Sequence, residues 1–142
     1  MTQINPYLSF TDKCEDAFNL YKSVFGGEFQ VVIRMTDMDL GIPIPEGGEN
    51  LIMHVSLPIG GSVLMGSDCP PGFGPPLAVG NNFSVSVSAD SKEEADRIHK
   101  ELSEGGTQTT PMDNAPWGSY FGMLTDKFGI NWMVSFDQKP EA

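Results

Sequence analysis

The chain contains an internal repeat, and this repeat restricts the possible folds more than any other feature of the sequence. The segments LSFTDKCEDAFNLYKSVFGG (8–27) and SVSADSKEEADRIHKELSEGG (86–106) align at an offset of 78 residues, and after one inserted residue both end in Gly-Gly. The matched pairs include Asp12 with Asp90, Glu15 with Glu93, Ala17 with Ala95 and Lys22 with Lys100. Each segment predicts a short strand and then a helix, with the Asp as N-cap and a Glu three residues later in the spacing of a capping box.

The second part of each repeat is less clear but has the same order. IMHVSLPIGGSVLM (52–65) can be placed over YFGMLTDKFGINWM (120–133) at an offset of 68 residues, which predicts a strand, a glycine-containing turn and a strand in both halves. Residues 28–35 and 107–112 add one more strand to each half. We therefore expect an α+β fold in which two βαβββ repeats form a curved mixed-sheet cup.

The repeat also sets the expected domain organisation. A chain of 142 residues is long enough for one domain with a substantial core. We expect the first repeat at residues 1–67, a Pro- and Gly-rich linker at 68–81, and the second repeat at 82–142, all within a single domain.

The charge of the chain argues against several classes of partner. Lys and Arg number 8 against 19 Asp and Glu, which gives a formal net charge of -11, whereas nucleic acids and anionic membranes are bound by basic surfaces. No apolar run approaches the ~20 residues of a membrane span, and MTQINPYLSF lacks the features of a signal peptide. Because the chain has only two cysteines, Cys14 and Cys69, we expect a reduced cytoplasmic protein that binds neither nucleic acid nor membrane.

Three stretches make the sequence resemble the PhnB-like branch of the vicinal oxygen chelate superfamily, which includes glyoxalase I, bleomycin-resistance proteins and extradiol dioxygenases. They are INPYLSF…CEDAFNLYKSVFGGEF, MHVSLPIGGSVLMGSD and WGSYFG…DKFGINWMVSF. The resemblance implies the glyoxalase/bleomycin-resistance/dioxygenase fold, a cup for a small molecule, and a homodimer. Proteins similar to this branch are often labelled as ubiquinone-pathway methyltransferases, but the sequence has no Gly-rich strand-to-helix turn suited to an adenosyl cofactor.

Metal-using relatives in that superfamily typically bind the metal through two His and two Glu. The resemblance places the four corresponding positions at Asn5, Leu64, Asn82 and Trp132, and these are not the imidazole, thiolate or carboxylate ligands of a first-row metal. A one-residue shift would reverse the faces of a strand. The residues brought in by such a shift are Ile4 or Pro6, Val63 or Met65, Asn81 or Phe83, and Asn131 or Met133. Because this set is no better, we expect no metal and no other cofactor.

A metal site elsewhere in the cup is the alternative. His54 is the only histidine on a predicted strand, and Asp68 and Cys69 are the best remaining ligands beside it; such a centre would suit a lyase, isomerase or dioxygenase-type enzyme. A single histidine on a strand is more often a hydrogen-bonded wall residue than a metal ligand. Cys14 starts the apolar stripe of the first helix and is expected to be a packed thiol, whereas His99 lies among charged residues and is expected to be exposed.

Aromatic and polar side chains near the expected cup define the ligand-binding prediction, because ligand sites commonly combine aromatic rings with a few amides and hydroxyls. The predicted ligand-binding residues are Asn5, Tyr7, His54, Asn82, Trp117, Tyr120 and Trp132. The resemblance points Trp132 inward, although any one of these aromatics can equally fill a core. No catalytic residue is assigned.

The sequence therefore predicts a metal-free protein that binds a small, partly apolar or aromatic molecule. An enzyme with the displaced centre and an interaction module without a ligand are the alternatives. The acidity of the chain would suit a cationic ligand.

Overall fold

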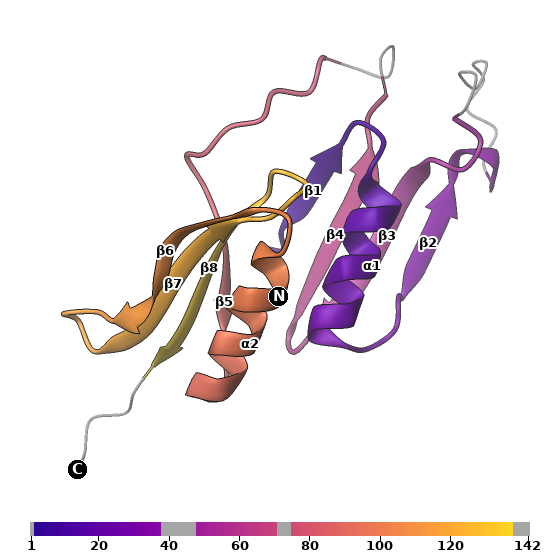
Figure 1. Ribbon diagram of the computed structural model, residues 1–142. Helices are drawn as coiled ribbons and strands as arrows, with labels where there is room; N and C mark the ends of the chain where they lie inside the picture. Colours follow the sequence, from indigo (N-terminus) through magenta and orange to yellow (C-terminus); the bar gives the residue numbers. More distant parts are fainter. Residues whose placement is uncertain (1, 38–47, 71–74, 138–142) are drawn as a thin grey trace. The chain divides into compact units, whose positions relative to one another are not determined.

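The computed structural model describes residues 2–37, 48–70 and 75–137. Within these ranges the chain forms eight β-strands and two α-helices. It divides into two compact units, Met1–Ala78 and Val79–Ala142, each with one helix and one four-stranded mixed sheet (Figure 1). The predicted α+β class and the two βαβββ repeats are confirmed.

The first unit consists of β1 (Tyr7–Phe10), α1 (Cys14–Phe25), β2 (Val31–Arg34), a short 3-10 helix (Met35–Asp37), β3 (Ile52–Ile59) and β4 (Ser62–Asp68). Its sheet has the strand order β1-β4-β3-β2. β1 is parallel to β4, and the other neighbours are antiparallel.

The second unit repeats this arrangement with β5 (Val85–Ser88), α2 (Lys92–Ser103), β6 (Thr107–Asn114), β7 (Ser119–Thr125) and β8 (Asn131–Asp137). Its sheet has the order β5-β8-β7-β6. Here β5 is parallel to β8, so the pairing of the first strand with the last strand is the same in both units.

The core of the first unit lies between α1 and one face of its sheet. Phe18 and Tyr21 of α1 are buried and meet edge to face at 5.4 Å between ring centroids. A Cβ atom built on Gly66 of β4 would lie 2.6 Å from Cε1 of Phe18, so the helix approaches this strand as closely as a residue without a side chain allows. Leu64 and Leu57 are register partners on the same face and are also buried.

The N-cap of each helix lies one residue after the predicted N-cap. α1 starts after Lys13, which has no side-chain capping bond, so the predicted cap at Asp12 with a capping box at Glu15 is wrong. α2 is capped by Ser91, whose Oγ accepts a hydrogen bond from Glu94 N–H at 3.1 Å, rather than by Asp90. The reason for the difference at α1 is a side chain from β4, described below.

Among the residues that the structure describes, neither helix has the length and apolar character needed to cross a membrane.

The tight contact between Gly66 and α1 gives a stability prediction. We expect Gly66→Ala to lower the free energy of unfolding by about 1–3 kcal/mol, because the new methyl group would meet the Phe18 ring and, at 2.9 Å, the backbone oxygen of Leu8. Urea unfolding followed by circular dichroism measures this change. Gly61→Ala is the matched control, since a Cβ atom there meets nothing within 4 Å. Equal stability of the two variants would contradict the close approach of α1.

Candidate functional site

The face of the first sheet opposite α1, called here the distal face, carries the most site-like group of side chains. Strand alternation separates it from the helix-covered face, where Leu8, Leu64 and Gly66 lie. The strand residues on the distal face are Tyr7, Ser9, Val31, Ile33, His54, Ser56, Pro58, Val63, Met65 and Ser67. None of these described residues is an Asp, Glu, Lys or Arg, so the face is composed of rings, aliphatic groups, a thioether and hydroxyls.

A row of four residues crosses this face. The register pairs Tyr7 with Met65, Met65 with Ser56, and Ser56 with Val31. Each strand of the sheet therefore contributes one side chain to the row. Ser9 and Ser67 are partners in the next row, where His54 pairs with Ile33.

Tyr7 and His54 form a stacked pair on the distal face. Their ring centroids are 5.8 Å apart and their planes differ by 29°, and Tyr7 Oη lies 3.5 Å from His54 Nδ1. Tyr7 is 48% exposed although it is a large aromatic side chain. Of the predicted ligand-binding residues, these two are brought into direct contact.

Ser56 is an unusual member of the row. The residue is only 3% exposed, and its Oγ is a buried side-chain atom with no hydrogen-bond partner within the described parts of the chain. Buried hydroxyls in proteins are normally bonded, and an unpaired one costs free energy. The sequence analysis missed Ser56, Ser67 and Met65, and the signal that could have found them was the alternation of small polar with apolar residues in IMHVSLP and SVLMGSD.

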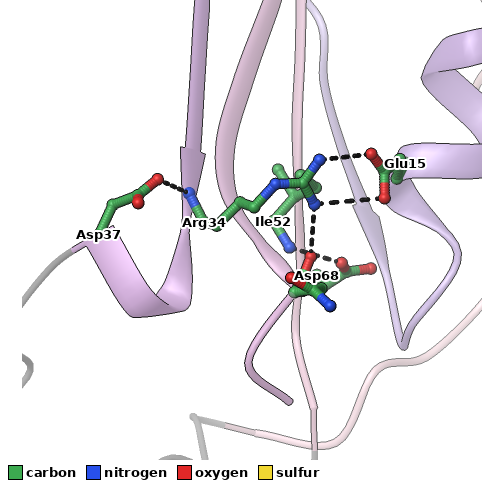
Figure 2. A network of polar contacts seen from close by, with 6 residues as sticks. Glu15, Arg34, Asp37, Ile52 and Asp68 are labelled. Atoms are coloured by element: carbon green, nitrogen blue, oxygen red, sulfur yellow. Dashed lines mark hydrogen bonds and ion pairs between the residues drawn. The ribbon is translucent and has the colours of Figure 1, made fainter. Parts of the chain in front are cut away.

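The helix-covered face contains Asp68, the carboxylate that the alternative hypothesis placed in a displaced metal centre. Asp68, at the end of β4, is 6% exposed. Its Oδ1 accepts a hydrogen bond from Cys14 N–H at 3.0 Å. Its Oδ2 accepts one from Ile52 N–H at 2.8 Å (Figure 2). The carboxylate thus binds a free N–H at the start of α1, where a negative charge is favourable. Burial raises the pKa of Asp68, and the two backbone hydrogen bonds oppose that shift.

An ion pair lies beside this carboxylate. The Arg34 guanidinium contacts both oxygens of Glu15 on α1, with Nη2–Oε2 at 2.5 Å and Nη1–Oε1 at 3.2 Å (Figure 2). Nη1 also donates to the carbonyl oxygen of Asn50 at 2.8 Å. The hydrogen bond from Arg34 lowers the pKa of Glu15. Glu15 therefore connects α1 to β2 instead of closing a capping box.

The predicted centre of His54, Asp68 and Cys69 is not formed. His54 lies on the distal face, whereas Asp68 lies on the helix-covered face with both oxygens bonded to backbone N–H groups. Cys69 and Cys14 are both free thiols. Cys14 is fully buried, and burial raises the pKa of its thiol, which opposes thiolate formation. Among the described residues, no group of three or more His, Cys, Asp or Glu is arranged to hold a metal.

The four positions that correspond to a superfamily metal site do not fit a metal either. Asn5 Oδ1 accepts the backbone N–H of Val63 at 3.1 Å, and Asn82 is exposed. Leu64 is 3% exposed on the helix-covered face. Trp132 is 1% exposed. Amide, isobutyl and indole groups in these environments offer no ligand set for a transition metal.

Trp132 faces the helix and not the ligand side that the resemblance implied. Trp132 is the register partner of Leu124, and two residues along the strand Val134 is the partner of Gly122. A Cβ atom built on Gly122 would lie 3.1 Å from the His99 ring of α2, so Gly122 faces this helix. Alternation therefore places Trp132 under α2. Its Nε1–H donates to Oδ2 of the buried Asp126 at 2.9 Å. The apolar series of this strand is a core series, and the sequence analysis assigned Trp132 to the wrong face.

Tyr120 also lies on the α2 side. Its hydroxyl donates to Asp96 Oδ1 of α2 at 2.6 Å, and this hydrogen bond raises the pKa of Tyr120 to about 12. Trp117 is different: it is 69% exposed and meets Phe121 edge to face at 5.6 Å. Both residues belong to the second unit.

His99 is buried, contrary to its predicted exposure. It is 4% exposed, and its Nε2 lies 3.1 Å from the carbonyl oxygens of both Thr110 and Met123. Both partners are acceptors, so Nε2 carries the proton. The ring connects α2 to β6 and β7 and is a structural residue of the second unit.

Comparison with known proteins agrees with this fold. The sequence model of the family described as 3-demethylubiquinone-9 3-methyltransferase matches residues 2–135. Protein YjdN of Escherichia coli strain K12 is 30% identical over 140 residues, which cover 93% of each chain. The crystal structure of protein PA1353 from Pseudomonas aeruginosa has 36% identity and a TM-score of 0.87, covering 98% of this chain and 100% of that one.

Two further solved structures define the wider relationship. The PhnB protein from Bacillus cereus, described as a putative 3-demethylubiquinone-9 3-methyltransferase, has 26% identity and a TM-score of 0.75, covering 95% of this chain and 99% of its own. A glyoxylase/bleomycin resistance protein/dioxygenase domain from Frankia sp. EAN1pec has 14% identity and a TM-score of 0.66. This last likeness shows the shared fold alone.

The role of Asp68 can be tested by Asp68→Asn. The amide keeps one acceptor and loses the other, so we expect the free energy of unfolding to fall by about 1.5–3 kcal/mol. Burial raises the pKa of Asp68 in the folded state above its ordinary value of 3.8. The contribution of the Asp68 carboxyl group to the stability of the wild type is therefore largest below pH 3.8 and declines as the pH rises through the raised pKa. The deficit of the variant should therefore be largest in acid and should narrow as the pH rises.

Urea unfolding at a series of pH values measures this deficit. Asp90→Asn is the control, because Asp90 is exposed and its replacement should change stability by less than about 0.5 kcal/mol. If Asp68→Asn were as stable as the wild type at every pH, the bonds from Asp68 to α1 and β3 would not matter for folding.

Proposed function

The chain belongs to the PhnB-like family described as 3-demethylubiquinone-9 3-methyltransferase, and we propose that it is a metal-free protein that binds a small, partly aromatic molecule. The proposed binding surface is the distal face of the first sheet. Tyr7 and His54 are its central residues, with Ser56, Met65 and Ser67 beside them.

The observation that carries this proposal is the stacked Tyr7–His54 pair on a face that also holds a buried hydroxyl without a partner. Small-molecule sites combine apolar and aromatic surface with a few polar groups that orient the ligand. Tyr7 supplies an exposed ring, His54 supplies ring nitrogens, and Ser56 supplies the hydroxyl. A folded chain gains no stability from exposing Tyr7 or from leaving Ser56 unbonded, so both features favour a binding role over a structural one.

The arrangement of titratable groups favours binding without a metal. On the distal face, His54 is the single strong ligand for a transition metal among the strand residues that the structure describes. Protein metal sites need three or four such ligands. Asp68 is on the other face of the sheet, and its oxygens already accept two backbone hydrogen bonds.

The name of the family refers to methyl transfer, but the two described helices give this activity no support. Nucleotide-type cofactors commonly approach free N–H groups at a helix start that follows a Gly-rich turn. The segment between β1 and α1 is Thr-Asp-Lys, without glycine. The first turn of α1 is occupied by the Asp68 carboxylate, and the first turn of α2 is capped by Ser91.

Thermal-shift screening tests the proposed function. Full-length protein is treated with a chelator, and a library of small aromatic and aliphatic compounds is added before and after this treatment. We expect a bound compound to raise Tm equally in both samples, because the site needs no metal. Tyr7→Ala and His54→Ala should each remove most of the shift.

Phe29→Ala is the matched aromatic control, because its ring lies 5.1 Å from Lys22 Nζ on α1 and so belongs to the opposite side of the sheet. Native mass spectrometry of the same samples reports the predicted homodimer and any retained metal. About one metal per chain that is lost in His54→Ala, with ligand shifts that disappear on chelation, would overturn the proposal.

A further inference from the structure

Starting from the proposed binding function, we infer the chemical class of the ligand: an uncharged planar molecule that bears a hydroxyl or carbonyl oxygen. The site is the distal face of the first sheet, with the Tyr7–His54 pair as the contact for the ring and the Ser56 hydroxyl as the partner for the oxygen. This ligand class differs from the cationic ligand that the net charge of the chain suggests.

The described strand residues of the distal face carry no charged side chain, which favours an uncharged ligand. No Asp, Glu, Lys or Arg is present among its described strand residues. A charged ligand would lose hydration on binding and would find no opposite charge there, which is costly.

The location of the nearby ionised groups strengthens this argument. Glu15 and Arg34 neutralise each other across α1 and β2, and Asp68 is buried on the helix-covered face, with its oxygens directed at Cys14 and Ile52. The net charge of the protein acts from exposed acids, and salt screens such charges over about 8 Å under physiological conditions. Local neutrality therefore decides the choice of ligand more than the net charge does.

The side chains beside the aromatic pair favour a flat ligand. Tyr7 is half exposed and its ring is stacked at 29° to that of His54, so its outer surface offers a contact for another ring. Met65 is the register partner of Tyr7, and a thioether contacts aromatic edges favourably and adapts its shape.

The unbonded hydroxyl of Ser56 favours an oxygen on the ligand. Ser56 lies one strand beyond Met65 in the same row, and its Oγ has no partner in the described residues. A hydroxyl can both donate and accept, so either a phenolic hydroxyl or a carbonyl group would satisfy it. Met65 is the register partner of Ser56 on β4, and a flexible thioether side chain at this position can move to admit a ligand to the hydroxyl.

Three naphthalene probes of matched size test the inference: 2-naphthol, which is uncharged at neutral pH, 2-naphthoate and 2-naphthylmethylammonium. Their dissociation constants are measured by NMR titration of the full chain, using the ring signals of Tyr7 and His54. We expect 2-naphthol to bind and to shift these signals, and each charged probe to bind at least about tenfold more weakly, because an unpaired charge costs more than the 1.4 kcal/mol of a tenfold change.

Ser56→Ala separates binding from structure. We expect this variant to bind 2-naphthol about three- to tenfold more weakly, as the loss of one hydrogen bond predicts, while its Tm is unchanged or higher because an unpaired buried hydroxyl is removed. Ser23→Ala is the control, since Ser23 lies exposed on α1 and bonds the carbonyl of Leu20. It should leave the affinity for 2-naphthol unchanged.

The outcomes separate the inferred ligand class from the proposed binding function. If a charged probe shifts the Tyr7 and His54 signals as strongly as 2-naphthol, or if Ser56→Ala keeps full affinity, the inferred ligand class is wrong and the proposed binding function stands. If none of the three probes binds at this face, both the ligand class and the binding function assigned to this face are wrong.

Discussion

A single buried carboxylate fixes the geometry on which the first unit depends. Asp68 closes β4 and accepts hydrogen bonds from the first residue of α1 and the first residue of β3, so three elements meet at one side chain. Because α1 has no side-chain N-cap of its own, this long-range bond takes the place of a local one. It holds the helix against β4, where the Phe18 ring occupies the space over Gly66. The position of α1 then determines which face of this sheet the helix covers and which face it leaves uncovered.

This constraint also separates the charged groups from the neutral ones. The side of the sheet that faces α1 holds Asp68, the ion pair of Glu15 with Arg34, and the buried Cys14 thiol. The distal face is left with hydroxyls, rings and a thioether. A metal-dependent enzyme would need its carboxylates and imidazoles on one surface, whereas here the strand that carries His54 and the strand that ends at Asp68 direct these side chains to opposite faces. The separation of His54 from Asp68 and the lack of charged side chains among the described strand residues of the distal face therefore have one geometric cause.

The sequence predicted what depends on local periodicity and failed where distant residues decide. Both βαβββ repeats were found because strand alternation and helix stripes are local signals. The cap of α1 was assigned to Asp12, since no local rule reveals a partner 54 residues away. Trp132 was assigned to the ligand side because of the resemblance, although the apolar series of its strand also fits a core. The structure buries Trp132 under α2, where its indole N–H donates to Asp126. Of the predicted site residues, Tyr7 and His54 are in contact. Ser56 was missed because its alternation with apolar residues in IMHVSLP marks a strand face but does not reveal a buried hydroxyl without a partner.

The buried polar groups of the chain differ in a way that bears on function. Asp68, Asp126 and His99 each have partners that join secondary-structure elements or close a turn, so their burial is explained by the fold. Within the described residues, the Ser56 hydroxyl is the buried side-chain group without such a partner, and it costs stability that an alanine at the same position would not. Unfavourable groups of this kind are common where a protein keeps a site ready for a ligand. The destabilising serine and the exposed ring of Tyr7 occupy the same row of the same face, and one bound molecule with a ring and an oxygen would explain both.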